Sequence, residues 1–263
     1  MTECNAEQLE FYALGKRAVV GKFDGGMISS DGGALLLGEV EADPAGMDRL
    51  LVDCFLDAYT APPPQIWVDL DATDDPIHGE QEGRFFHGYY GHYCYLPLYI
   101  FSGEHLLCAR LRESNVDAAA GSVEELDRIF KQIRERWPHT EIIVRGDSGF
   151  CREDIMAWCE ANGVEFVLGL AKNARLNKRI ADALDEADRQ YHLSGQASRL
   201  FEDFPYRTLN SWSQSRRVIA KAEHLVKGAN PRYVVTSLPG ERADARTLYE
   251  DLYCARGDME NRI

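Results

Sequence analysis

The chain has 263 residues, of which 45% are hydrophobic and 27% charged, a globular composition that excludes an intrinsically disordered protein. No run approaches the roughly 18 apolar residues of a membrane span, and the N-terminus lacks the apolar stretch of a signal peptide, so we expect a cytoplasmic protein without a membrane partner. The formal net charge of −14 argues against nucleic acid as a partner of the chain as a whole, because nucleic-acid binders usually carry a basic face.

The first 60 residues give weak signals, and Ala-Pro-Pro-Pro at 61–64 ends them, because successive prolines force extended backbone. We expect residues 1–60 to form a short N-terminal region and residues 61–263 to form the main domain. Residues 66–71 alternate with period two, which predicts a strand with Trp67, Asp69 and Asp71 on one face. Residues 93–101 and 105–112 predict two further strands joined by a tight Ser-Gly turn.

The pattern then changes to the 3.6-residue period of helices, with short apolar strands between them. The expected elements are a helix at 122–137, a strand at 141–144, a helix at 152–162, a strand at 164–170, a helix at 173–188, strands at 198–208, 216–225 and 232–238, and a helix from about 243 to the chain end. This order predicts an α/β fold with a mixed five-stranded sheet flanked by helices. It is the element order of a ribonuclease H-like fold, with a β-strand insertion at about 195–240 before the last helix.

Two aspartates stand where strands are predicted to end. Asp71 ends the first strand, and Asp147 follows the strand at 141–144 in a Gly-containing turn. Because ligands of open α/β sheets bind beyond the carboxyl ends of the strands, the two carboxylates meet there if the strands are neighbours. Asp69 is an alternative to Asp71, since both share a strand face about 6.6 Å apart and only one can lie level with Asp147. Asp147 could instead serve the turn or the helix entry.

A third acid on a nearby helix would complete a set of oxygen ligands. Such a set suits Mg²⁺ or Mn²⁺, and two such ions can support phosphoryl transfer. The last predicted helix contains Tyr253, Arg256 and Glu260 in the pattern Y-x-x-R-x-x-x-E. The alternative is a solvated helix face in which Arg256 and Glu260 form an i,i+4 pair worth a few tenths of a kcal/mol.

These motifs together resemble the DDE-type transposases of bacterial insertion sequences, specifically DDE domain group 1. Besides Y-x-x-R-x-x-x-E, the resemblance rests on three long blocks: FDGGMISSDGGALLLGEVE (23–41), DLDATDDPIHGEQEGRFFHGYYGHYCYLPLYIF (69–101) and VRGDSGFCREDIMAWCEANGVEFVLGLAKNARL (144–176). It implies that Asp71, Asp147 and Glu260 are the catalytic and metal-binding triad, with two Mg²⁺ or Mn²⁺ ions as cofactors.

The resemblance also implies a function and partners. The activity would be metal-dependent DNA cleavage and strand transfer on double-stranded DNA, at transposon ends and target, by a nucleoid-associated bacterial protein that could form a homodimer. The family pattern has a Lys seven residues after the Glu, at what would be position 267, and a longer segment before the first Asp. The alternative is therefore a truncated, inactive remnant that binds DNA or a partner. A third hypothesis is a host nuclease that reuses the fold.

Positive charge is concentrated in one segment. Residues 172–232 hold 12 Lys and Arg against 7 Asp and Glu, whereas the remainder holds 17 against 36. Lys and Arg there could grip DNA phosphates, although a solvated surface explains them equally well. The candidate DNA contacts are Tyr253, Arg256, Lys172, Arg175, Arg216 and Arg217.

Aromatic residues are concentrated in another segment. Residues 85–101 contain eight Phe or Tyr in seventeen positions. The sequence favours a core role for them, and stacking on unpaired bases is the alternative.

Overall fold

The computed structural model describes residues 9–11, 19–21 and 44–260, and it divides the chain into two compact units, 1–47 and 48–263. In the first unit, β1 (Leu9–Phe11) and β2 (Val19–Gly21) pair antiparallel. The Gly-rich block at 23–41 lies outside the described residues.

The second unit is built on one large mixed sheet. Among the described residues it has nine strands in the order β11-β12-β14-β10-β9-β3-β7-β8, with β13 paired to β12. The strands are β3 (Gln65–Ala72), β7 (Leu98–Ser102), β8 (His105–Arg110), β9 (Glu141–Gly146), β10 (Glu165–Leu170), β11 (Ser198–Tyr206), β12 (Arg216–Leu225), β13 (Gly228–Ala229) and β14 (Arg232–Thr236). The sheet is therefore larger than the five strands predicted.

The strand directions make the sheet mixed. Strand β3 is parallel to β9 and β9 to β10, while β7 is antiparallel to β3 and β8 to β7. A large mixed sheet with helices fits a ribonuclease H-like fold. The inserted strands at 198–236 do not form a separate layer, because β14 pairs antiparallel with β10 and extends the same sheet. That pairing satisfies backbone groups that an open edge at β10 would leave unpaired.

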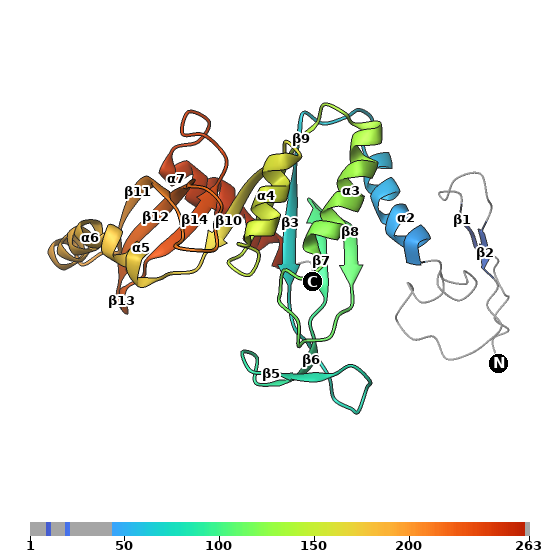
Figure 1. Cartoon of the computed structure of the whole chain (residues 1–263), viewed down its shortest axis with the longest axis horizontal. Helices are drawn as coiled ribbons and strands as arrows, with labels where there is room; N and C mark the ends of the chain where they lie inside the picture. Colours follow the sequence, from blue (N-terminus) through green and yellow to red (C-terminus); the bar gives the residue numbers. More distant parts are fainter. Residues whose placement is uncertain (1–8, 12–18, 22–43, 261–263) are drawn as a thin grey trace, which may run out of the picture. The chain divides into compact units, whose positions relative to one another are not determined.

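Two helices cover one face of this sheet (Figure 1), and a third packs beside them. Helices α3 (Ser122–Arg136) and α4 (Glu153–Ala161) bury Leu126, Ile129 and Phe130 among others against the strands. Helix α2 (Pro44–Asp57) packs on α3, where Arg128 Nη1 donates to the Asp48 carbonyl at 3.0 Å. The compact unit thus begins at residue 48, before the boundary predicted at 61.

The other face is covered by an irregular helical segment at the C-terminal end of the described chain. It runs through α7 (Ala245–Thr247), a π-helix η1 (Leu248–Tyr253), a 3₁₀ turn η2 (Cys254–Arg256) and α8 (Gly257–Glu260). Its buried residues Leu248 and Tyr249 pack against strand residues of a second core cluster. The helix predicted here is present, but it changes its winding where Tyr253 meets the sheet, and π turns are frequent at functional sites.

Two predicted elements are each divided. The helix expected at 173–188 is α5 (Ala174–Arg179) and α6 (Ala181–Ser194), with a break at Ile180. The strand expected at 93–101 is β6 (His92–Tyr95) and β7, because Pro97 lies between them and cannot donate to a strand ladder.

Strand β6 belongs to a small separate sheet. It pairs with β4 (Asp75–Pro76) and β5 (Phe85–His87), and this sheet lies beyond the ends of β3 and β7, at the bottom of Figure 1. Its aromatic side chains are largely solvent-exposed: Phe86 is 59% exposed and Tyr89 87% exposed. The prediction that residues 85–101 fill a core is wrong for this part, since a sheet of three short strands cannot bury both of its faces.

None of the helices in the described ranges combines the length and apolar character required to cross a membrane.

Candidate active site

The site lies where two neighbouring parallel strands end. In the register of β3 and β9, Asp69 pairs with Arg145 and Leu70 with Gly146. The next residues, Asp71 and Asp147, therefore stand at the same level, on the face covered by the C-terminal helical segment. Both side chains are partly buried. The sequence predicted that these carboxylates would meet if the strands were neighbours. The strands are neighbours, so the condition is met, and the meeting of the carboxylates stays a prediction.

One level earlier, Asp69 has a different role. Its carboxylate accepts two hydrogen bonds from the Arg145 guanidinium, Nε to Oδ1 at 2.6 Å and Nη2 to Oδ2 at 2.8 Å, and both side chains are buried. Arg145 also donates from Nη1 to the Leu252 carbonyl at 2.6 Å and lies 5.1 Å above the Trp67 ring. Asp69 thus belongs to a closed ion pair that attaches the C-terminal segment to the sheet. This leaves Asp71 as the acid level with Asp147.

Asp147 is shaped by the turn that follows it. Its Oδ1 accepts the Gly149 N–H at 2.7 Å, and its carbonyl accepts the Phe150 N–H at 3.2 Å. The turn role considered from the sequence is therefore present. It fixes the orientation of the carboxylate and engages one of its two oxygens, so the second oxygen can serve another ligand.

Tyr253 packs into the space beside Asp147 on the third strand. Gly169 of β10 is level with Asp147, and a Cβ there would lie 2.5 Å from the Tyr253 hydroxyl and 2.9 Å from the Ser148 nitrogen. Burial raises the pKa of Tyr253 and Asp147 adds to the rise, while the Arg256 cation and its hydrogen bond oppose it. Sequence reasoning missed Gly169, although a glycine inside a strand often marks such a close approach.

Positive charge reaches the site from Arg256. Its Nη1 lies 3.8 Å from Asp71 Oδ1, and both side chains are about 15% exposed. The charges of the site also act on Tyr90, in the turn between β5 and β6. Burial raises the pKa of Tyr90, and Asp74 and Asp71 raise it further. The negative potential of the aspartates therefore extends to the small sheet.

The residues present fit a divalent cation in their chemistry. Two carboxylates at one level repel each other, and their oxygens are the ligands that Mg²⁺ and Mn²⁺ prefer. Within the described residues, no group of three or more His, Cys, Asp or Glu side chains forms a metal cluster. Glu260 closes α8, but its side chain lies outside the part of the chain that the structure describes, so the third ligand stays a prediction.

Comparison with known families is consistent with this site. Residues 41–263 match the family described as transposase DDE domain group 1. The chain belongs to this family of DDE transposase domains. A search of curated proteins found no match.

In this transposase domain, two of the predicted DNA contacts, Arg216 and Arg217, form ion pairs with acidic side chains. Arg216 is buried between Glu153 and Glu160, with its Nη1 2.7 Å from Glu153 Oε2 and its Nε 2.6 Å from Glu160 Oε1. Burial raises the pKa of Glu153, but hydrogen bonds from Arg216 and Ser213 outweigh it and lower that pKa to about 2.

Arg217 is likewise engaged, since it pairs with Asp203 at 2.7 Å and donates to the carbonyls of Leu238 and Ala243. Both arginines therefore connect elements of the domain. Lys172 and Arg175 are exposed instead, just beyond the carboxyl end of β10. Arg175 lies 5.2 Å above the Tyr206 ring, at a pocket of about 470 Å³.

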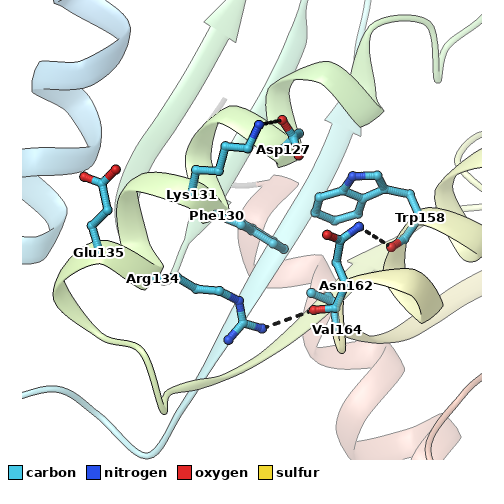
Figure 2. Close-up of a pocket in the computed structure, with 8 residues that line it drawn as sticks. All are labelled: Asp127, Phe130, Lys131, Arg134, Glu135, Trp158, Asn162 and Val164. Carbon is cyan, nitrogen blue, oxygen red and sulfur yellow. Dashed lines mark hydrogen bonds and ion pairs between the residues drawn. The ribbon is translucent and has the colours of Figure 1, made fainter.

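A second pocket of the transposase domain, of about 420 Å³, lies between α3 and α4 (Figure 2). Lys131 pairs there with Asp127 at 2.6 Å, and Arg134 points across to the carbonyl of Asn162. Because α3 and α4 cover the face opposite Asp71 and Asp147, this pocket is separate from the carboxylate site.

Proposed function

We propose that this protein is a DNA transposase in which Asp71 and Asp147 bind divalent cations for DNA cleavage and strand transfer. The observation that carries the proposal is the placement of two like-charged carboxylates at one level, at the carboxyl ends of neighbouring parallel strands. Two anions side by side are unfavourable by themselves, and a bound cation would turn their repulsion into attraction. Family membership supports the same chemistry.

Each residue of the site would have a defined task. Asp71 and Asp147 would hold the cations, and the Gly149 N–H would keep Asp147 oriented. When bound, Mg²⁺ or Mn²⁺ would act as a Lewis acid and stabilise charge on the attacking and leaving oxygens. Arg256, beside Asp71, would orient that carboxylate or contact a DNA phosphate, with Tyr253 held behind it.

Glu260 would supply the third carboxylate. It lies one helical turn, about 6 Å, beyond Arg256, whose guanidinium already reaches Asp71. This proximity of Arg256 supports placing Glu260 near the two aspartates.

The proposed reaction has two steps on DNA. In the first, water attacks the phosphorus of a phosphodiester at the transposon end and the P–O3′ bond breaks. The water oxygen stays on the 5′-phosphate, and a proton from water converts the released 3′-oxygen to a 3′-hydroxyl. The 3′-hydroxyl then attacks a target phosphodiester and displaces a 3′-oxygen. Lys172 and Arg175 would contact the backbone of double-stranded DNA, and two copies could hold the two ends. A reaction on these substrates would place the protein at the bacterial nucleoid.

Nicking of supercoiled plasmid in Mn²⁺ tests the proposal. Asp71→Asn and Asp147→Asn should each lower the nicking rate by about a thousandfold, because several kcal/mol of transition-state stabilisation depend on the bound cations. Asp185→Asn, on the exposed side of α6, is the matched control and should nick at the wild-type rate.

Glu260→Gln tests the third ligand and should behave like the two aspartate variants. Equal nicking by the wild type and Asp147→Asn, or nicking that persists in EDTA, would refute the proposal. A folded wild-type protein that binds DNA without nicking it would indicate the inactive remnant instead.

A further inference from the structure

The turn between β5 and β6 displays aromatic side chains to solvent. We call residues 84–93 the aromatic hairpin. Within it Tyr89 is 87% exposed, Phe86 59%, Tyr93 48% and Phe85 40%. Exposed apolar side chains grouped in this way usually mark a binding surface, whereas scattered ones need no explanation.

The exposed rings are held in defined positions. Phe86 and Tyr93 are cross-strand partners whose ring centroids lie 5.6 Å apart, edge to face. The Arg84 guanidinium lies 5.0 Å above the Tyr93 ring. At the tip, the Gly91 N–H donates to the His87 carbonyl at 2.8 Å and closes the turn that carries Tyr89. Ordered rings lose little entropy when a ligand stacks on them.

The aromatic hairpin lies beside the carboxylate site. The negative charges of Asp71 and Asp147 both contribute to the raised pKa of Tyr90, after its burial and the charge of Asp74. Tyr89 packs edge-on against Tyr90 with ring centroids 5.0 Å apart. The Nε2 atom of His92 lies 2.6 Å from Asp74 Oδ2 and ties β6 to the segment that follows Asp71. Tyr90 thus connects the exposed ring of Tyr89 to the carboxylate site.

The charge of the hairpin favours bases over phosphates. Residues 84–93 contain one arginine and no lysine, aspartate or glutamate. Phosphate binding relies on clusters of Lys and Arg, whereas a nucleobase needs only a π face on which to stack. Bases expose their faces once they leave the duplex stack.

We propose that the aromatic hairpin binds unpaired nucleobases of the DNA strand that enters the active site, with Tyr89 as the main stacking residue and the Phe86–Tyr93 pair as a second platform. The proposal rests on the proposed function for the identity of its ligand. It adds a base-binding surface to a site defined so far by carboxylates and cations.

Metal-free DNA binding tests this proposal independently of cleavage. Random-sequence duplexes with four unpaired bases at the 3′ end, labelled there with 2-aminopurine, are titrated with the full chain in EDTA and compared with blunt duplexes. Stacking on Tyr89 should quench the 2-aminopurine fluorescence and make the tailed duplex bind more tightly. Tyr89→Ala should weaken tailed-duplex binding by about five- to a hundredfold and leave blunt-duplex binding unchanged.

Two further variants separate stacking from a general loss of structure. Tyr89→Trp should keep the quenching, because it keeps a π face. Leu193→Ala removes a side chain that is also 87% exposed, on α6, and should bind like the wild type.

The proposal is overturned if the wild type does not prefer the tailed duplex, or if Tyr89→Ala binds both duplexes like the wild type. It is also overturned if sedimentation equilibrium shows a dimer for the wild type and a monomer for Tyr89→Ala, since the aromatic hairpin would then be a protein interface. Plasmid nicking is scored separately. If the wild type nicks plasmid but shows no Tyr89-dependent preference for the tailed duplex, only this inference is refuted. If it shows that preference but does not nick plasmid, only the proposed function is refuted.

Discussion

The register of β3 and β9 brings together two pairs of charged residues, one inside the strands and one where they end, and the pairs are of opposite kinds. Asp69 and Arg145 attract each other and are closed by two hydrogen bonds in a buried setting. Two residues further along, the register brings two like charges, Asp71 and Asp147, to one level where the strands end, with Arg256 Nη1 3.8 Å from Asp71 Oδ1. The comparison teaches that the Asp69–Arg145 pair stabilises the fold, while the two negative charges of Asp71 and Asp147 favour the binding of a cation.

Breaking the buried ion pair between Asp69 and Arg145 should have the largest effect on stability. Arg145→Met leaves the Asp69 carboxylate buried and unpaired, and we expect it to lower the free energy of unfolding by about 3–5 kcal/mol. Urea unfolding followed by circular dichroism measures this. The double variant Asp69→Leu/Arg145→Met should recover much of the loss, and Arg189→Ala, 70% exposed on α6, should change little. A single variant as stable as the wild type would contradict the comparison.

Metal bound at Asp71 and Asp147 should raise the stability of the folded protein. Mn²⁺ at a hundred times its dissociation constant should raise the free energy of unfolding by about 2.7 kcal/mol, provided that it binds only the folded state. Asp147→Asn should abolish this gain because it removes a ligand and the repulsion together, whereas Asp185→Asn should retain it. Thermal unfolding with and without Mn²⁺ measures both. An equal gain in Asp147→Asn would place the metal elsewhere.

A smaller loss of stability should follow from adding a methyl group at Gly169, beside Asp147. Gly169→Ala places a Cβ against the Tyr253 hydroxyl and the backbone at Ser148, so we expect a loss of about 2 kcal/mol on unfolding. The double variant Gly169→Ala/Tyr253→Phe should regain part of it, because the hydroxyl is the nearest atom. Full stability of Gly169→Ala would mean that Tyr253 does not pack there.

The smallest effect concerns pH at another closed ion pair. Arg216 lowers the pKa of Glu153 to about 2 from an ordinary 4.5, so Glu153 contributes stability that is fully present above pH 4.5 and is lost as the pH falls toward 2. Glu153→Gln should therefore cost about 1 kcal/mol at pH 7, after allowance for partial exposure, and about a tenth of that at pH 2, where the folded-state pKa lies. Urea unfolding at both pH values measures this, and a cost independent of pH would exclude the ion pair as its cause.

The aromatic segment shows where local pattern fails to predict burial. Residues 85–101 looked like core because of their composition, but Pro97 divides them between two sheets. Phe101 in the large sheet is buried, whereas Phe86 and Tyr89 in the small sheet are exposed. Composition reports how much apolar surface exists, and only the pairing of strands decides how much of it is covered.

The basic residues show the same limit. Arg216 and Lys172 look equivalent in the sequence, yet one is buried between two glutamates of α4 and the other is exposed. Those glutamates are more than fifty residues away from Arg216 along the chain, so no local pattern could have linked them.

By itself the sequence determined the chemistry and the local order of this protein: which residues could bind a cation, where most strands and helices lie, and which family the motifs resemble. Those properties depend on residue types and on short-range periodicity. The tertiary structure decided that Asp71 lies level with Asp147 while Asp69 is closed by Arg145. It also decided that the inserted strands continue one sheet and that the aromatic hairpin stays in solvent. Register and burial depend on contacts between residues far apart in the chain, so folding establishes them and the local pattern does not.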